Sequence, residues 1–414
     1  MDNRNKWWVI SIPNLLLWID VIILIINSGT ALQLVSRNTQ YLMFIPLIFH
    51  CGSIIRTRKN QKLIPFIACV LVIVCTAIMH LDSTINYYIL LLVNIFSVFG
   101  IVITYGINEI LSKFIKVISF LAPISLIGYY LVNNTSFGSS FATYTNSNGV
   151  IYSFSYLYVF RRDLIFRNHG IFWEPGIYAT VLVVSMVYLV IRAKRNADIT
   201  RRDILATALQ ILVFSWALFT TNSSAGIILF MLFLLFFFMI RGERNRNSNG
   251  LAKSIVSTLM VFVVIIGILN YNSILQYFGL ADNYFFSRIS SAEGFTKNAR
   301  YLYIMKCFEL IGKNPILGYG VVETNNLIAQ GVGDTCTSLY SILVFGICGL
   351  GYTILFIYSI MKQRYGLSAS IVLCAMSIFI LNKEPHLQIM LTWTILFGLL
   401  WENGSHVQNE MLYE

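Results

Sequence analysis

Residue types that could do chemistry are concentrated between positions 167 and 176, which read Arg-Asn-His-Gly-Ile-Phe-Trp-Glu-Pro-Gly. Arg167 could bind a phosphate through two hydrogen bonds, because a guanidinium group is planar and stays charged. Glu174 or His169 could take a proton from a hydroxyl group. The same stretch also fits the ordinary start of a helix, with Pro175 in the first turn. It therefore predicts either an anion-binding site or a helix entry.

The composition indicates what kind of element must position these residues. Of the 414 residues, 57% are hydrophobic and 11% are charged, and the mean hydropathy is +0.72. A soluble protein of this length needs more charge to cover its surface, whereas repeated apolar runs of about 20 residues are typical of membrane-spanning helices. The net charge of +11 comes from basic residues that lie between the apolar runs and not in one patch. We therefore expect a membrane protein with no nucleic-acid partner.

The apolar runs predict an all-α polytopic membrane protein with about twelve transmembrane helices, in one integral membrane domain over residues 1–414. The first run has no small-residue cleavage pattern, so we expect it to stay as an uncleaved helix. The expected spans lie near 8–34, 40–56, 63–80, 86–107, 111–133, 174–192, 203–221, 224–241, 254–272, 337–361, 367–382 and 386–401.

Lysine and arginine residues predict which side of the membrane each connection faces. Most of them fall on the connections that share a side with the N-terminus, and the short connections on the other side retain only Arg37 and Lys383. Because cytoplasmic connections are enriched in these residues, we expect both termini to be cytoplasmic. Two long loops, 134–173 and 273–336, then face outward, and we expect the functional site there.

The first long loop predicts a β-hairpin, because Asn148-Gly149 is a typical tight turn. Five aromatic residues alternate with other residues from Tyr152 to Phe160 and would share one face of a strand. They could form an aromatic belt at the membrane surface or a platform on which sugar rings stack. A helix is also compatible with this run.

Three arginines follow the aromatic run. Topology disfavours arginines on the outer face, so another reason is needed for them. We expect them to bind an anionic ligand, with anchoring to lipid headgroups as the alternative. They are Arg161, Arg162 and Arg167.

The polar turn 220–226 reads Thr-Thr-Asn-Ser-Ser-Ala-Gly and joins two apolar segments. It is too short to leave the membrane surface. We expect its hydroxyl groups either to cap the second of these helices or to line a site beside the long loops.

The second long loop predicts an amphipathic helix from 298 to 312 that lies on the outer leaflet. Its apolar face would hold Ile304, Cys307, Phe308 and Ile311.

Glycines follow this helix at two places. Gly318 and Gly320 stand in a turn and would permit a close approach of the backbone. Gly346, Gly349 and Gly351 fall in the next apolar run and would suit close helix packing.

Asp20 lies in the middle of the first apolar run and is expected to face the bundle as a buried structural partner. The seven cysteines show no metal-binding spacing, so no metal site is expected. A disulfide between Cys307 and Cys336 is the less favoured alternative to free thiols.

Three of these features together resemble the O-antigen polymerase family, which shares a superfamily with the O-antigen ligases. They are the stretch 167–176 at the end of a long outer loop, the turn 220–226, and Arg300 ahead of the glycine-bearing turn 314–320. The resemblance covers residues 160–350, and the rest of the chain matches only in helix count and hydrophobicity.

The resemblance implies that a growing glycan on undecaprenyl pyrophosphate is transferred onto the non-reducing sugar of another lipid-linked repeat unit. Such enzymes act at the periplasmic face of the bacterial inner membrane without a metal or another cofactor. The implied partners are this lipid-linked oligosaccharide and membrane lipids, and a chain-length regulator is a further candidate partner.

On this basis we expect Arg167 and Arg300 to stabilise the charge of the donor pyrophosphate. Glu174 is the first candidate for the general base and His169 the second, although Glu174 could instead orient Arg167. The further residues expected at the substrates, or as bases of lower rank, are Arg161, Arg162, Trp173, Arg288, Asp334 and Glu384.

Two other functions compete with polymerisation. The related ligases, which transfer glycan to the lipid A core, carry a histidine near the end of the second loop and often an arginine in the 220–226 turn. This chain has no histidine in 333–338 and has Ala225 in the turn. A flippase for lipid-linked oligosaccharides would place polar groups at the membrane midplane in repeated halves, whereas this chain has few such groups and no visible internal repeat.

Overall fold

The computed structural model describes residues 12–56, 63–80, 85–146, 149–155, 157–195, 200–242, 299–329, 336–363, 365–383 and 386–402. The predicted span 254–272 lies outside these residues.

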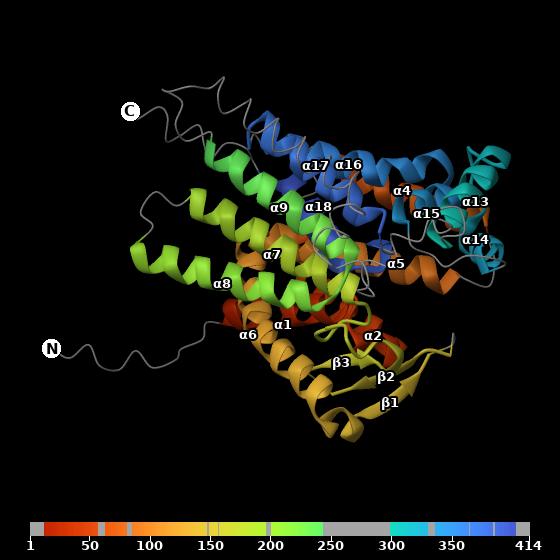
Figure 1. Cartoon of the computed structure of the whole chain (residues 1–414). Helices are drawn as coiled ribbons and strands as arrows, with labels where there is room; N and C mark the ends of the chain where they lie inside the picture. Colours follow the sequence, from red (N-terminus) through yellow and green to blue (C-terminus); the bar gives the residue numbers. More distant parts are fainter. Residues whose placement is uncertain are drawn as a thin grey trace, which may run out of the picture.

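Apolar helices make up most of the structure and pack side by side (Figure 1). Among the described residues, five helices are long and apolar enough to cross a membrane, and shorter apolar helices accompany them. The predicted architecture of a polytopic membrane protein is confirmed in this form. The long helices are α5 (Ile85–Tyr105), α6 (Ile107–Asn134), α7 (Pro175–Arg195), α8 (Arg201–Thr220) and the segment Thr337–Met361, which contains α15 (Thr337–Phe345) and α16 (Leu350–Met361). The shorter ones include α1 (Ile12–Ile26), α4 (Ile64–Met79), α9 (Ser224–Gly242), α17 (Leu367–Leu381) and α18 (Met390–Trp401).

The predicted span 337–361 is interrupted between α15 and α16, where another part of the backbone packs into the break. Gly346 has a φ of +63°, and a Cβ atom there would collide with the carbonyl oxygen of Ile316. A Cβ atom at Gly318 would lie 2.5 Å from the backbone nitrogen of Gly346. The predicted close approach of the backbone is therefore confirmed for Gly318, and the close packing predicted for the glycines of this run is confirmed for Gly346. It is wrong for Gly351, which has open space beside it.

A three-stranded antiparallel sheet forms in the first long loop, so the prediction of an all-α fold is wrong in this part. The predicted hairpin is present as β1 (Ala142–Thr145) and β2 (Ile151–Phe154), and β3 (Val159–Arg161) pairs with β2. The Asn146 side chain closes the hairpin by accepting a hydrogen bond from the backbone nitrogen of Val150 at 2.9 Å.

The aromatic residues of this loop do not share one strand face, because the chain turns back between β2 and β3. Tyr152, Tyr158 and Phe160 are each at most 4% exposed. Gly128 of α6 allows the Tyr158 ring to pack against the helix, since a Cβ atom there would lie 2.7 Å from that ring. These rings are core residues of the loop, and their predicted exposure as a belt or a sugar platform is wrong.

The sheet lies at one end of the bundle, beside α2 (Ala31–Val35) and the C-terminal part of α6 (Figure 1). At the other end, the last residue of α7 forms an ion pair with a residue that follows α18, where Arg195 Nη1 lies 3.1 Å from Glu402 Oε1. We call these the sheet end and the opposite end.

A polar chain crosses the interior between α1, α3 (Phe44–Arg56) and α5. Asp20 Oδ2 lies 2.9 Å from His50 Nε2, and His50 Nδ1 lies 3.0 Å from Thr104 Oγ1. Asp20 and His50 are both buried. The prediction that Asp20 faces the bundle as a structural partner is confirmed.

The amphipathic helix predicted in the second long loop is present as α13 (Ala299–Lys313), but it buries a different face. Tyr303 and Cys307 are buried, whereas Ile304 and Phe308 are exposed. Helix α13 packs against α15 along its Tyr303 side, which leaves Ile304 and Phe308 on the outside. Contact of this outer face with the outer leaflet stays a prediction.

Candidate functional site

The stretch 167–176 lies at the sheet end and leads directly into α7. This helix begins at Pro175, and the carbonyl oxygen of Glu174 accepts hydrogen bonds from the backbone nitrogens of Ile177 and Tyr178 at 3.1 and 3.3 Å. The predicted helix entry is confirmed. The residues before Pro175 are also tied to several other elements, which an ordinary helix entry does not require.

The backbone of this stretch is held from two sides. The Trp173 nitrogen donates to the carbonyl oxygen of Gly29, between α1 and α2, at 3.1 Å. The Val159 nitrogen in β3 donates to the carbonyl oxygen of Gly170 at 2.8 Å. Gly170 has a φ of +58°, and a Cβ atom there would lie 3.1 Å from the Tyr178 ring, so this position requires glycine.

Asn168 joins the stretch to the turn between α8 and α9. Its Nδ2 donates to Thr220 Oγ1 at 2.9 Å and to Ser125 Oγ at 3.3 Å, and its backbone nitrogen donates to the Thr220 carbonyl oxygen at 2.9 Å. Its Oδ1 accepts from the Gly170 nitrogen at 2.9 Å. Asn168 is fully buried. From the sequence we assigned it no role, although it stands within the stretch that we singled out.

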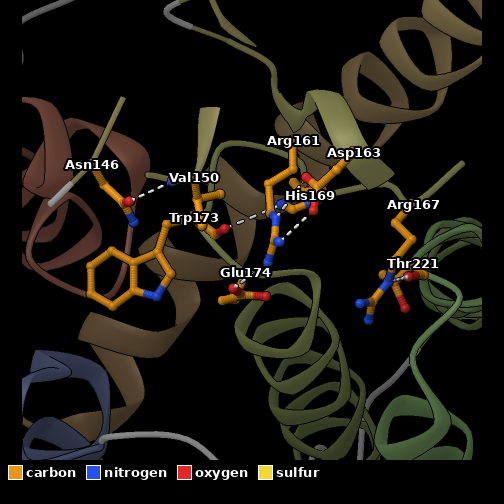
Figure 2. Close-up of polar contacts among 9 residues, drawn as sticks. All are labelled: Asn146, Val150, Arg161, Asp163, Arg167, His169, Trp173, Glu174 and Thr221. Atoms are coloured by element: carbon orange, nitrogen blue, oxygen red, sulfur yellow. Dashed lines mark hydrogen bonds and ion pairs between the residues drawn. The ribbon is translucent and has the colours of Figure 1, made fainter. Parts of the chain in front are cut away.

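Arg167 points to the same turn (Figure 2). Its Nε donates to the carbonyl oxygen of Thr221 at 3.2 Å, and Asn222 Nδ2 donates to the carbonyl oxygen of Phe166 at 2.6 Å. Two motifs that lie more than 50 residues apart in the sequence therefore meet, and the turn lines the site beside the loop. The helix-capping alternative also holds, because the Ser223 hydroxyl accepts a hydrogen bond from a backbone N–H in the first turn of α9 at 3.2 Å.

Glu174 is paired with Arg161. Glu174 Oε1 lies 3.4 Å from Arg161 Nη1, while Arg167 turns toward Thr221 (Figure 2). Arg161 makes shorter contacts to Asp163, at 2.6 and 3.1 Å. Glu174 thus contacts a second arginine of the loop, Arg161, and its expected role in orienting Arg167 stays a prediction.

Burial and charge fix the protonation of this cluster. The hydrogen bond from Arg161 lowers the pKa of Asp163. Burial lowers the pKa of Arg161, but the hydrogen bond to Asp163 and the charge of Glu174 outweigh that effect and raise it. Burial, together with the charge of Glu174, raises the pKa of Tyr152 to about 12. At neutral pH Arg161 and Asp163 are therefore charged and Tyr152 is neutral.

His169 lies inside the protein beneath these residues. It is fully buried, and its Nδ1 lies 3.2 Å from the carbonyl oxygen of Trp173. Burial, followed by the positive charge of Arg167, lowers the pKa of His169 to about 3. The imidazole is neutral and weakly basic at pH 7.

Of the remaining predicted residues, the structure describes the side chains of Arg162 and Trp173. Arg162 is exposed, and its Nε donates to Ser153 Oγ at 3.0 Å. Trp173 is half-buried and packs against the apolar core. The backbone of Arg300 lies in the first turn of α13. The Arg300 side chain and the residues Arg288, Asp334 and Glu384 lie outside the described part of the chain.

Lys383 is a residue of this region whose place we did not predict. It is 4% exposed, and its Nζ donates to the carbonyl oxygen of Gly176 in the first turn of α7 at 2.9 Å. This contact brings the connection between α17 and α18 to the start of α7. A lysine on a short outer connection was the available signal, but we used it only to assign topology.

Across the described residues, no three His, Cys, Asp or Glu side chains are close enough together to hold a metal ion. Cys307 and Cys336 are free thiols, so the alternative disulfide is absent.

Residues 209–336 match a family model that is described as O-antigen ligase. The matched region begins within α8 and contains the turn that binds Arg167 and Asn168. Comparisons with curated proteins and with solved structures found no match.

Proposed function

The chain belongs to the O-antigen ligase and polymerase superfamily, and on that premise we propose that it polymerises lipid-linked oligosaccharide repeat units. The donor is a growing glycan on undecaprenyl pyrophosphate, and the acceptor is the non-reducing sugar of another repeat unit. One observation carries the proposal most directly. The arginine-bearing stretch 166–168 is hydrogen-bonded to the turn 220–222, which lies in the region that matches the family.

Arg167 acts on the leaving group in this proposal. When the bond between the anomeric carbon and the pyrophosphate oxygen breaks, negative charge grows on the pyrophosphate. The hydrogen bond to Thr221 orients the guanidinium group in advance, so it can stabilise this charge without reorganising. The N-terminus of α7 begins at the end of the same stretch, at Pro175, and also favours an anion.

Glu174 acts as the general base. The acceptor hydroxyl oxygen forms the new bond to the anomeric carbon, and its proton passes to this carboxylate. The Glu174 side chain is 30% exposed and can reach an acceptor, and Asp163 takes the two shorter contacts to Arg161. His169 suits the role less well, because it is fully buried and its pKa is lowered to about 3.

The proposal places the protein in the inner membrane of a bacterium, with both termini in the cytoplasm and the sheet end in the periplasm. It is supported by basic residues near the start of α6 and at the end of α7, which line one cavity, because such residues are enriched on the cytoplasmic side. They are Lys113, Arg192 and Arg195. Green fluorescent protein fused to the C-terminus should fluoresce, and alkaline phosphatase fused there should be inactive. An active phosphatase fusion would contradict this orientation.

The ligase reaction is the second candidate, because the matched family carries that description. Against it, the turn has Ala225 where ligases often have an arginine, and no histidine occurs in 333–338.

Deletion of the gene in its native strain separates these functions. Loss of a polymerase should leave single repeat units on the lipid core in a gel of surface polysaccharide, and the wild-type gene should restore the ladder of long chains. A core that carries no repeat unit would instead indicate a ligase or a flippase and would overturn the proposal.

A further inference from the structure

The opposite end of the bundle contains a cavity of about 710 Å³ between α1, α6 and α7. Its lining has an excess of positive charge, with four basic side chains and one acidic side chain, that of Glu109. The basic residues are Lys113, Lys116, Arg192 and Arg195.

The spacing of these residues along α6 and α7 brings their side chains to the same cavity. Lys113 and Lys116 are three residues apart on α6, and Arg192 and Arg195 are three residues apart on α7, so each pair shares one helix face. Enrichment of basic residues in cytoplasmic connections explains their presence at this end, but not their convergence on one cavity. Like charges on neighbouring turns repel each other, so the arrangement favours an anion between them.

The protein itself neutralises only part of this charge. Arg195 is paired with Glu402 at 3.1 Å. Across the described residues, no carboxylate lies within ion-pair distance of Lys113, Lys116 or Arg192. Lys116 and Arg192 are exposed at the rim.

An apolar cavity of about 130 Å³ adjoins the basic one, and the two share Asn108, Tyr188, Ile191 and Arg195 in their linings. The apolar cavity continues between α7, α17 and α18. A basic cavity beside an apolar one fits a ligand with an anionic head and a hydrocarbon chain.

We propose that this end of the bundle binds an anionic phospholipid. The phosphodiester group lies among Lys113, Lys116 and Arg192, and one acyl chain enters the adjoining apolar cavity. In the orientation proposed above, this lipid comes from the cytoplasmic leaflet. A small soluble anion could use the basic cavity, but it gives no account of the apolar one.

The test uses the purified full-length protein in detergent and native mass spectrometry, with phosphatidylglycerol as the probe. The pocket variant is Lys116→Gln/Arg192→Gln, which changes two exposed side chains and leaves the half-buried Lys113 in place. The matched control is Arg201→Gln/Arg202→Gln, which removes the same charge from exposed positions in the first turn of α8, outside the cavity. We expect phosphatidylglycerol affinity to fall about 30-fold in the pocket variant and less than about threefold in the control.

Two further probes identify the source of the phosphate. Phosphatidylcholine, which is zwitterionic, should not displace phosphatidylglycerol. Glycerophosphoglycerol, which has the headgroup without acyl chains, should bind at least about 100-fold more weakly. Equal loss in both variants, no loss in the pocket variant, or equal affinity for the soluble headgroup would each overturn the proposal.

Discussion

The basic residues near the two ends of α7 differ in how they are held. At the sheet end, Arg161 and Arg167 are fixed by hydrogen bonds to Asp163 and to the carbonyl oxygen of Thr221. At the opposite end, Lys116 and Arg192 stand exposed at the rim of a cavity. Fixed charges suit the brief charge of a transition state, because little energy is spent on reorientation. Exposed charges around a cavity suit a ligand that exchanges with the membrane.

The largest effect should come from removing the fixed arginine that faces the turn. We expect Arg167→Ala to lower the rate of polymer formation about 100-fold to 1,000-fold, because a prearranged charge at the leaving group is lost. The measurement is the rate of chain extension on lipid-linked repeat units, at equal amounts of folded protein.

Arg162→Ala is the matched control for that variant. Arg162 is an exposed arginine of the same loop and contacts Ser153 away from the turn. Its loss should change the rate less than about threefold. Similar losses for the two variants would mean that the general charge of the loop matters and not the contact with Thr221.

Glu174→Gln should lower the same rate about 100-fold, because the acceptor hydroxyl loses its general base. The acidic limb of the pH–rate profile should disappear with it, which a purely structural carboxylate would not cause. The companion variant Asp163→Asn removes the shorter partner of Arg161 and should reduce the rate only a few-fold, as Arg161 then pairs more closely with Glu174. An unchanged pH profile in Glu174→Gln would remove Glu174 from the role of base.

The contacts of Arg161 also show which features could not be predicted from the sequence. The helix start at Pro175 and the hairpin between β1 and β2 depend on local backbone preferences, and both were predicted. The contact of Arg161 with Glu174 depends on how the sheet packs against the start of α7, so no spacing in the sequence indicates it.

The residues that were missed have partners far away in the sequence. Lys383 contacts Gly176 across 207 positions, and Asn168 contacts Thr220 across 52. The prediction that the aromatic residues share one strand face was wrong for a different reason. Ser155 closes an unpredicted turn, in which its backbone N–H donates to the Tyr158 carbonyl oxygen at 2.8 Å. A period of two predicts a strand, but it cannot show where a turn without glycine or proline divides that strand.

Asn168→Ala tests whether the turn holds the sheet end in place. The change removes a fully buried amide with its bonds to Thr220 and Ser125, and it takes away the acceptor of the Gly170 backbone nitrogen, so we expect a loss of about 1–3 kcal/mol in the free energy of unfolding. The polymerisation rate should fall about tenfold as Arg167 loses its orientation. Asn133→Ala, at an exposed asparagine of the same end, should cost less than about 0.5 kcal/mol when unfolding is followed in detergent. Equal losses of unfolding free energy in Asn168→Ala and Asn133→Ala would show that the buried hydrogen bonds of Asn168 do not stabilise the sheet end.

The smallest effect concerns His169, whose pKa is lowered to about 3 by burial and by the charge of Arg167. The unfolded chain takes up a proton on this residue below about pH 6.5 and the folded protein does not, so stability falls as the pH falls through this range. Between pH 7 and pH 5 the loss should be about 2 kcal/mol for this residue. His169→Gln should be less sensitive to acid than the wild type by this amount, when thermal unfolding is compared at the two pH values. His386 has a pKa lowered to about 3 as well, so the variant should keep part of the acid sensitivity. Parallel losses in variant and wild type would show that His169 can take up a proton in the folded protein, and His169 would then return as a rival to Glu174 for the general base.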